Sequence, residues 1–135
     1  MAPMNPRTTV LAAGLFGVSA VIFGAFGAHA LHGLLLERGM AAVWETAVQF
    51  HLVHAVALLA LAGWWRGQAP SVATRRAAWA ARCWTLGITL FSGSLYFLAL
   101  GAAPRWFGPI TPLGGLSLMA GWVCLIAAGF APASD

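Results

Sequence analysis

The residue types best suited to chemistry in this sequence lie close together in one apolar stretch, residues 41–65. An acid, an amide and two imidazoles occur there within ten positions, as Glu45, Gln49, His51 and His54. A charged side chain near the centre of a bilayer costs on the order of 3 kcal/mol, so such residues are usually paired, face a cavity or take part in chemistry. We therefore expect a candidate site to form around this stretch.

Metal binding is the most specific chemistry that these residues suggest. Imidazoles and carboxylates are ligands that zinc, copper and nickel accept. Two His-x-x-His pairs, His29 with His32 and His51 with His54, have the i, i+3 spacing that lets both members lean toward one side of a helix. Helical zinc sites use i, i+4 spacing instead, so neutral histidines bonded across helices are the alternative. The metal candidates are His29, His51, His54 and Glu45.

Helix geometry limits how many of these groups can meet. With Glu45 placed at 0° on an ideal helix, Gln49 comes at about 40°. His54 comes at about 180° and His51 at about 240° on the same scale. The acid and the amide therefore face one neighbour while the histidines face another, unless the helix departs from ideality.

A catalytic role has ingredients in the sequence but no recognisable scaffold. Ser92 or Ser94, together with a histidine and Glu45, would supply a nucleophile, a base and an orienting group. No nucleophile elbow and no evident oxyanion hole accompany them. The sequence therefore names no catalytic residue, implies no cofactor firmly, and leaves open whether the protein is an enzyme, with non-catalytic binding the favoured interpretation.

The composition places these residues in a membrane protein. Of the 135 residues, 61% are hydrophobic and only 7% are charged, and the mean hydropathy is +0.84. So few charges cannot cover the surface of a soluble domain of this size. The net charge of +4 comes from scattered arginines and no basic patch, which argues against nucleic acid as a partner. The implied partner is the lipid bilayer.

Four apolar segments, each near the roughly 20 residues that a spanning helix needs, fill most of the chain. They are residues 9–31, 41–65, 82–100 and 112–130. We predict an all-α integral membrane four-helix bundle, with residues 1–135 forming a single transmembrane domain.

The arginines predict the orientation of this bundle. Loops rich in arginine stay on the cytoplasmic side of a membrane. One side would carry Arg7, Arg66, Arg75, Arg76 and Arg82, and the other Arg38 and Arg105. Both termini are therefore predicted to be cytoplasmic.

The first and last of these segments each carry a face of small residues. The members of each face fall within an arc of roughly 80° on an ideal helix. Small side chains let helix backbones approach closely in lipid. The predicted packing residues are Ala13, Gly17, Ala20, Gly24, Gly27, Ser117 and Gly121.

Polar or backbone-exposing residues from all four segments fall at one depth, toward the outer leaflet. This coincidence predicts a polar pocket that binds a small polar ligand, a lipid headgroup or a partner helix without catalysis. The alternative is binding or transport of zinc, copper or nickel by His and Glu ligands. The predicted ligand-binding residues are His29, Glu45, Gln49, His54, Ser92, Tyr96, Gly114 and Gly115.

Five short motifs, taken in order, resemble those of one family. They are Gly24–Leu31, Thr46–Phe50 followed by His54-Ala55, Phe91–Tyr96, Ile110–Gly115 and Gly121-Trp122. Over nearly its whole length the chain resembles the small membrane proteins of the domain of unknown function 423 family. Phe50 and His51 stand where that family is expected to have tyrosine and often glutamine, so the resemblance supports His29, Gln49 and His54 more than His51.

The resemblance implies a multi-pass protein of the bacterial inner membrane with four helices, and it brings no activity with it. So short a chain leaves much of each helix facing outward. A homo-oligomer or another membrane protein is therefore a further candidate partner, because faces of small residues also pack between protomers.

Overall fold

The computed structural model describes residues 4–102 and 107–132, so Arg105 of the orientation argument lies outside the described residues. Within those residues the chain is helical with short connections and has no strand. The helices are α1 (Pro6–Ala28), α2 (His32–Glu37), α3 (Ala41–Trp65), α4 (Val72–Ala99) and α5 (Ile110–Gly129). The prediction of an all-helical protein is confirmed, although the described part has five helices where four were predicted.

Two capping boxes explain where α1 and α4 begin. Asn5 accepts a hydrogen bond from the backbone N–H of Thr8, whose hydroxyl accepts one from the backbone N–H of Asn5. Ser71 and Thr74 form the same reciprocal pair. Such pairs satisfy N–H groups that the first turn of a helix leaves without partners. α4 therefore starts directly after Ser71, well before the start at residue 82 that the apolar run predicted.

The short helix α2 lies between the first two apolar segments, where the sequence predicted no helix. Its Leu35 is buried against Trp44 and Tyr96, while its first and last residues, His32 and Glu37, are exposed. One buried side chain in six residues is too little for a helical periodicity to be visible in the sequence.

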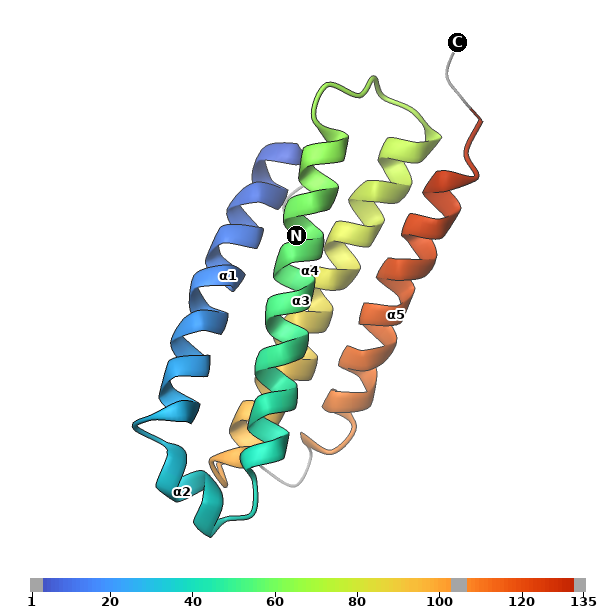
Figure 1. The fold of residues 1–135 in the computed structure, drawn as a ribbon. Coiled ribbons are helices and arrows are strands. Elements are labelled where there is room, and N and C mark those ends of the chain that lie inside the picture. Colours follow the sequence, from blue (N-terminus) through green and yellow to red (C-terminus); the bar gives the residue numbers. More distant parts are fainter. Residues whose placement is uncertain (1–3, 103–106, 133–135) are drawn as a thin grey trace.

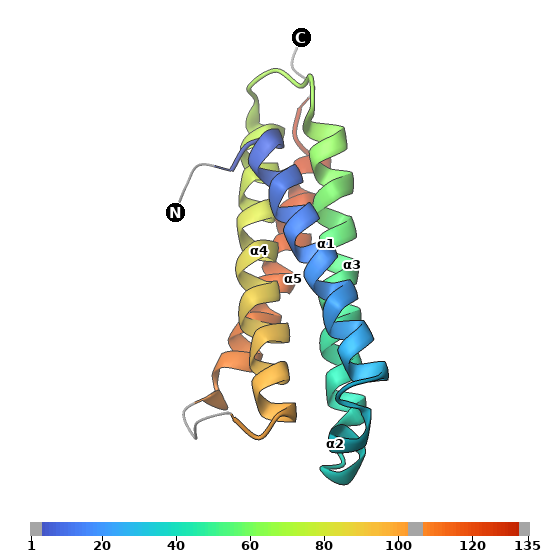
Figure 2. The same ribbon diagram turned by 90° about the vertical axis from the view of Figure 1, so that its left-hand side faces the viewer.

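The four long helices run alternately up and down (Figure 1). α3 packs between α1 and α4, and α5 packs on α4. The start of α1, the connection between α3 and α4, and the end of α5 lie at one end, and α2 lies at the other (Figures 1 and 2). We call the first the arginine end, because Arg7, Arg66 and Arg75 lie there, and the second the α2 end.

Two clusters of buried side chains hold the helices together. The larger one joins Leu58 of α3 to Trp84 of α4 and Leu118 of α5. The other, at the α2 end, joins Trp44 of α3 to Tyr96 of α4. α3 and α4 therefore form the centre of the molecule, and α1 and α5 cover it from either side.

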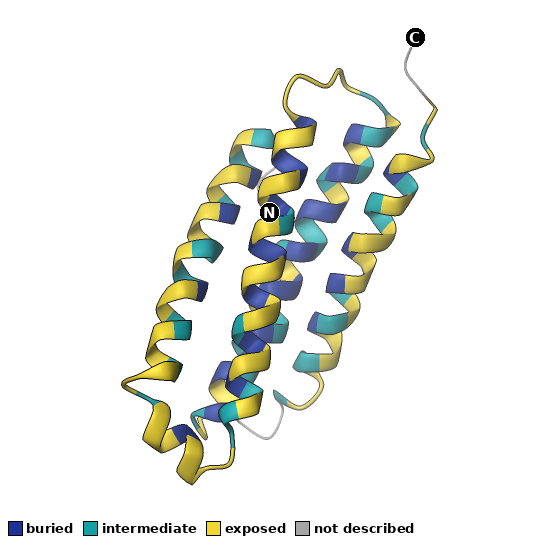
Figure 3. Ribbon diagram, viewed as in Figure 1, coloured by how far each residue is buried: buried dark blue, intermediate teal, exposed yellow. Residues whose placement is uncertain are grey.

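The outward surfaces of α1 and α5 are apolar. α1, α3 and α5 are each long and apolar enough to cross a membrane. Leu15 and Val21 of α1 and Val123 and Ile126 of α5 are each more than 60% exposed, and both helices are exposed along their length (Figure 3). Contiguous exposed apolar surface of this extent is expected of a protein in contact with lipid.

Glycines allow α4 and α5 to approach closely. A Cβ atom on Gly114 would overlap the backbone of Phe91, and one on Gly121 would overlap the indole ring of Trp84. Between them, the hydroxyl of Ser117 donates to the carbonyl oxygen of a residue on α4, Cys83, at 2.8 Å. Close backbone approach of this kind gives the dispersion contacts that drive helix association in lipid.

We expect Gly114→Ala to destabilise the protein and Gly115→Ala to change its stability little. The new methyl group at position 114 would meet backbone atoms that cannot rotate away, and overpacking costs about 1–3 kcal/mol. At position 115 the nearest atoms are ring carbons of Phe91 at 3.7 and 3.8 Å, an ordinary contact. Thermal unfolding in detergent micelles measures both variants, and equal melting temperatures would contradict the close packing of α4 and α5.

Candidate functional site

A pocket of about 540 Å³ lies at the α2 end between α1, α2 and α3. Glu45 and Gln49 line it from neighbouring turns of α3, and His32 lines it from the start of α2. We call it the α2-end pocket. The other lining residues are Gly24, Gly27, Ala28, Leu35, Ala41, Trp44 and Val48.

Trp44 forms a fixed wall of the α2-end pocket. Its side chain is buried, and its Nε1 donates a hydrogen bond of 2.9 Å to the carbonyl oxygen of Phe23. The ring of Phe23 packs edge-on against the indole, with centroids 6.2 Å apart. Gly27 permits this arrangement, because a Cβ atom there would overlap the indole ring. The apolar side of the pocket is therefore held in place by both α1 and α3.

The polar side chains that α3 contributes to this pocket are exposed. Among the described residues, neither Glu45 nor Gln49 has a side-chain hydrogen bond or an ion-pair partner. A carboxylate in this state can accept charge-assisted hydrogen bonds from a cationic group. The polar chemistry of the α2-end pocket is therefore free for a ligand.

His51 is buried and connects α1, α3 and α4. Its Nε2 lies 3.2 Å from the hydroxyl oxygen of Ser19 on α1, and its Nδ1 lies 3.2 Å from the hydroxyl oxygen of Tyr96 on α4. Phe16 and Phe23 pack against the imidazole, with ring centroids 5.5 and 6.2 Å away. The ring is thus enclosed by aromatic groups and bonded at both nitrogens.

One arrangement of protons uses every donor of this network. The Ser19 hydroxyl lies 2.9 Å from the carbonyl oxygen of Leu15 and donates to it. His51 Nε2–H then donates to the Ser19 oxygen, and the Tyr96 hydroxyl donates to His51 Nδ1. In this arrangement His51 is a neutral imidazole with a structural role.

His54 has different partners on α3 and α5. Its Nδ1–H donates to the carbonyl oxygen of Phe50 at 2.8 Å, and its Nε2 accepts a hydrogen bond from the indole N–H of Trp122 at 3.1 Å. The Trp122 ring packs in turn against Trp84, with centroids 4.8 Å apart. These two bonds fix His54 as a neutral imidazole. His54 also borders, with Gln49, a smaller pocket of about 170 Å³.

The predicted metal ligands are not brought together. His51 and His54 already use both ring nitrogens in contacts with protein atoms. His29 is exposed at the C-cap of α1, and Glu45 faces the α2-end pocket. Among residues 4–102 and 107–132, no three His, Cys, Asp or Glu side chains lie close enough to hold a metal ion.

Ser92 and Ser94, the serines that could have served as nucleophiles, form no hydrogen bond with a histidine among the described residues. Ser92 is fully buried, and its hydroxyl has no hydrogen-bond partner there. Ser94 donates to the carbonyl oxygen of Phe91 and lies 2.7 Å from the hydroxyl of Thr111. Neither of these two serines is therefore paired with a histidine base in the part of the chain that the structure describes.

Only two of the predicted ligand-binding residues, Glu45 and Gln49, line the α2-end pocket. Tyr96 and His54 belong to the buried bonds described above, and Gly114 is covered by Phe91. The remaining three, His29, Ser92 and Gly115, are absent from its lining.

Sequence reasoning missed Ser19 and Trp122 as partners of the two histidines. Ser19 has a signal, because it shares one side of α1 with Phe16 and Phe23 at i, i+3 and i, i+4 spacings. For Trp122 the sequence gives no such signal beyond its place after Gly121 in the last motif. Tryptophan often hydrogen-bonds through its indole N–H when buried or at a boundary, so the partner cannot be named from the type alone.

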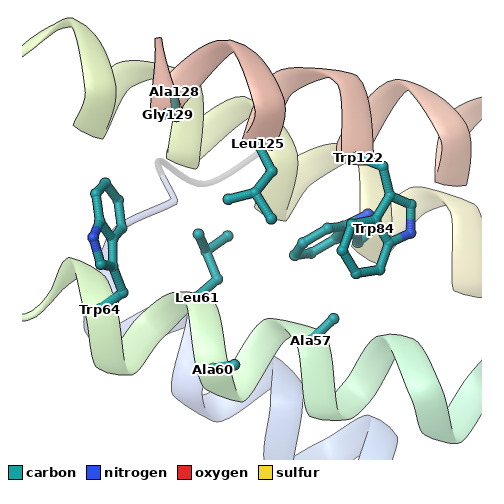
Figure 4. Close-up of a pocket in the computed structure, with 9 residues that line it drawn as sticks. All are labelled: Ala57, Ala60, Leu61, Trp64, Trp84, Trp122, Leu125, Ala128 and Gly129. Carbon is teal, nitrogen blue, oxygen red and sulfur yellow. The ribbon is translucent and has the colours of Figure 1, made fainter. Parts of the chain in front are cut away.

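A third cavity, an apolar groove of about 440 Å³, lies between α3 and α5 over Trp84 of α4 (Figure 4). Ala57 and Leu61 line it from α3, and Trp122 and Leu125 line it from α5. It has no charged side chain in its lining, so it offers a polar ligand little beyond indole nitrogens.

Comparison with known proteins places the chain among small membrane proteins. A family model described as "Protein of unknown function (DUF423)" matches residues 23–115. A UPF0382 membrane protein of Staphylococcus haemolyticus is 42% identical over 107 residues, covering 79% of this chain and 82% of that protein. The UPF0382 membrane protein YwdK of Bacillus subtilis is 38% identical, covering 81% and 85%. The UPF0382 inner membrane protein YgdD of Escherichia coli is 36% identical, covering 91% and 89%. No solved structure matches.

We expect Tyr96→Phe to lower the free energy of unfolding by about 1 kcal/mol, because His51 Nδ1 loses its donor. Side-chain hydrogen bonds between membrane helices contribute about 0.6 kcal/mol on average and at most about 1.7 kcal/mol. The loss should disappear when Tyr96→Phe is made in a His51→Phe background. Thr89→Val is the matched control, because the exposed Thr89 hydroxyl bonds only to its own helix, at the Thr85 carbonyl. Unfolding in mixed micelles measures all four variants, and an undiminished loss in the His51→Phe background would contradict the bond.

Proposed function

Because the chain belongs to the DUF423 family, whose relatives are UPF0382 membrane proteins, we propose that it is a multi-pass inner-membrane protein that binds an amine-bearing phospholipid headgroup in the α2-end pocket, without catalysis. The observation that carries this proposal is the exposed Glu45 carboxylate, without an ion-pair partner among the described residues, beside the fixed apolar wall of Trp44.

The proposed topology has α1, α3, α4 and α5 crossing the membrane as a four-helix bundle, with the whole chain as one domain. α4 is the least apolar of the long helices and carries Arg75, Arg76 and Arg82, but its 28 residues are long enough to span. The arginine end faces the cytoplasm by the positive-inside rule, so both termini lie there. The α2-end pocket then opens in the outer half of the bilayer.

The depth of the pocket supports a headgroup as its ligand. Glu45 is the fifth residue of α3, so its Cα lies only about 6 Å along the helix from the first residue. That position corresponds to the boundary between headgroups and acyl chains, where a charged side chain costs less than at the bilayer centre. Val48, an apolar residue of the lining, lies about one turn deeper along α3, beside the first part of an acyl chain.

The donors and acceptors of the pocket match a zwitterionic headgroup. The Glu45 carboxylate would accept hydrogen bonds from a primary ammonium group, while the Gln49 amide and the His32 ring can donate to the neighbouring phosphate. A partner helix fits less well, because it would bury the carboxylate without a compensating charge. The exposed faces of α1 and α5 remain available for a second copy or another membrane protein.

We expect Glu45→Gln to weaken binding of phosphatidylethanolamine about tenfold, because hydrogen bonds to a charged group contribute about 1.5–3 kcal/mol. Its melting temperature should be unchanged, because Glu45 is exposed. Native mass spectrometry of protein titrated with this lipid measures the affinity, with phosphatidylglycerol as the comparison lipid.

Glu37→Gln is the control for this experiment, because Glu37 is an exposed acid of α2 that does not line the pocket. Wild-type affinity of Glu45→Gln for phosphatidylethanolamine would refute the proposal. If the wild type bound soluble ethanolamine phosphate as tightly as the lipid, the ligand of the pocket would be a small polar molecule and not a lipid headgroup.

A further inference from the structure

A pocket at the arginine end combines two cations from different helices. Arg7 of α1 and Arg66, the C-cap of α3, both line it, and its volume is about 510 Å³. Both side chains are exposed, and neither has a hydrogen-bond or ion-pair partner among the described residues. Two like charges that converge on one pocket without a counter-ion favour an anionic ligand.

Among the described residues, the charged side chains near this pocket are all positive. The acids of the described chain, Glu37 and Glu45, lie on α2 and on the first turns of α3, at the opposite end of the molecule. The positive end of the α1 dipole also lies here, but the negative end of the α3 dipole at Arg66 offsets it, so the two arginine side chains carry the attraction for an anion.

The apolar part of the pocket continues into the lipid-facing surface of α1. Val10 and Leu11 line it below the arginines and are 36% and 59% exposed. α1 itself is apolar and long enough to cross a membrane. The pocket therefore places cations at the headgroup level and aliphatic side chains at the level of the acyl chains, as an amphiphilic anion would require.

We propose that this pocket binds the phosphate headgroup of an anionic phospholipid of the leaflet at the arginine end, with Arg7 and Arg66 on the phosphate and an acyl chain along Val10 and Leu11. Basic pockets between membrane helices on the cytoplasmic side are suited to such headgroups. The site is independent of the α2-end pocket, because it lies at the other end of the molecule and selects the opposite headgroup charge.

The test is native mass spectrometry of the full-length protein titrated in micelles with phosphatidylglycerol and, separately, with phosphatidylcholine. Wild-type protein should bind phosphatidylglycerol more tightly. Arg7→Gln and Arg66→Gln should each weaken this binding about fivefold, because one arginine near the membrane surface contributes about 1 kcal/mol toward an anionic lipid. Both residues are exposed, so the folded state should survive each change, and melting temperatures check that.

Arg75→Gln is the matched control, since Arg75 is an exposed arginine at the same end that does not line the pocket. Its affinity for phosphatidylglycerol should equal that of the wild type, and an equal loss there would reduce the effect to general surface charge and overturn the proposal. Wild-type affinity in a variant that carries both Arg7→Gln and Arg66→Gln would also overturn it. So would displacement of the bound lipid by inorganic phosphate as effectively as by short-chain phosphatidylglycerol. Glu45→Gln should leave this binding unchanged, so the two sites fail or succeed separately.

Discussion

A polar side chain inside a bilayer is costly unless it finds a hydrogen-bond partner within the protein, and the two histidines of α3 find such partners on different helices. His51 bonds to Ser19 of α1 and Tyr96 of α4, while His54 bonds to Trp122 of α5. α3 is thereby tied to all three of the other long helices at mid-length. In lipid these bonds add direction to packing that is otherwise made of apolar contacts, which explains why imidazoles occur in so apolar a stretch.

This division separates structural polar groups from available ones. A histidine with both nitrogens bonded to protein has no lone pair for a metal and no free proton for a substrate. The Glu45 carboxylate and the Gln49 amide, on the other side of α3, have no such partners among the described residues. One side of α3 thus bonds to the neighbouring helices, and the other side has polar groups available for a ligand. For this reason the proposed ligand lies in the α2-end pocket and not among the histidines.

The sequence predicted the all-helical character and the membrane environment because both follow from composition and apolar run lengths. Helix geometry also separated Glu45 from the two histidines, as the structure does, whereas Gln49 borders a small pocket together with His54. The apolar run did not predict that α4 begins after Ser71, because Arg75 and Arg76 lower the hydropathy of its first turns. The capping box of Ser71 nevertheless starts the helix there. His51 received too little weight from the sequence, because the family resemblance compares only the residue types at each position. The bond between His51 and Ser19 depends instead on α1 and α3 being neighbours.

The charges that remain unpaired are distributed unequally along the molecule, and this distribution favours lipid as the common ligand. Among the described residues, the exposed acids Glu37 and Glu45 lie near the α2 end together with a single arginine, Arg38, and the exposed arginines Arg7, Arg66 and Arg75 lie at the other end. The distance between the two groups of charges matches the distance between the two headgroup layers of a bilayer. The affinity of a small soluble ligand would not depend on this separation. α1 and α5 leave most of their apolar surface exposed, so acyl chains must cover it. In the proposed topology, the headgroups of the lipids whose acyl chains cover these faces lie at the depth of the two polar pockets, so the proposed recognition of headgroups requires no further change in the fold.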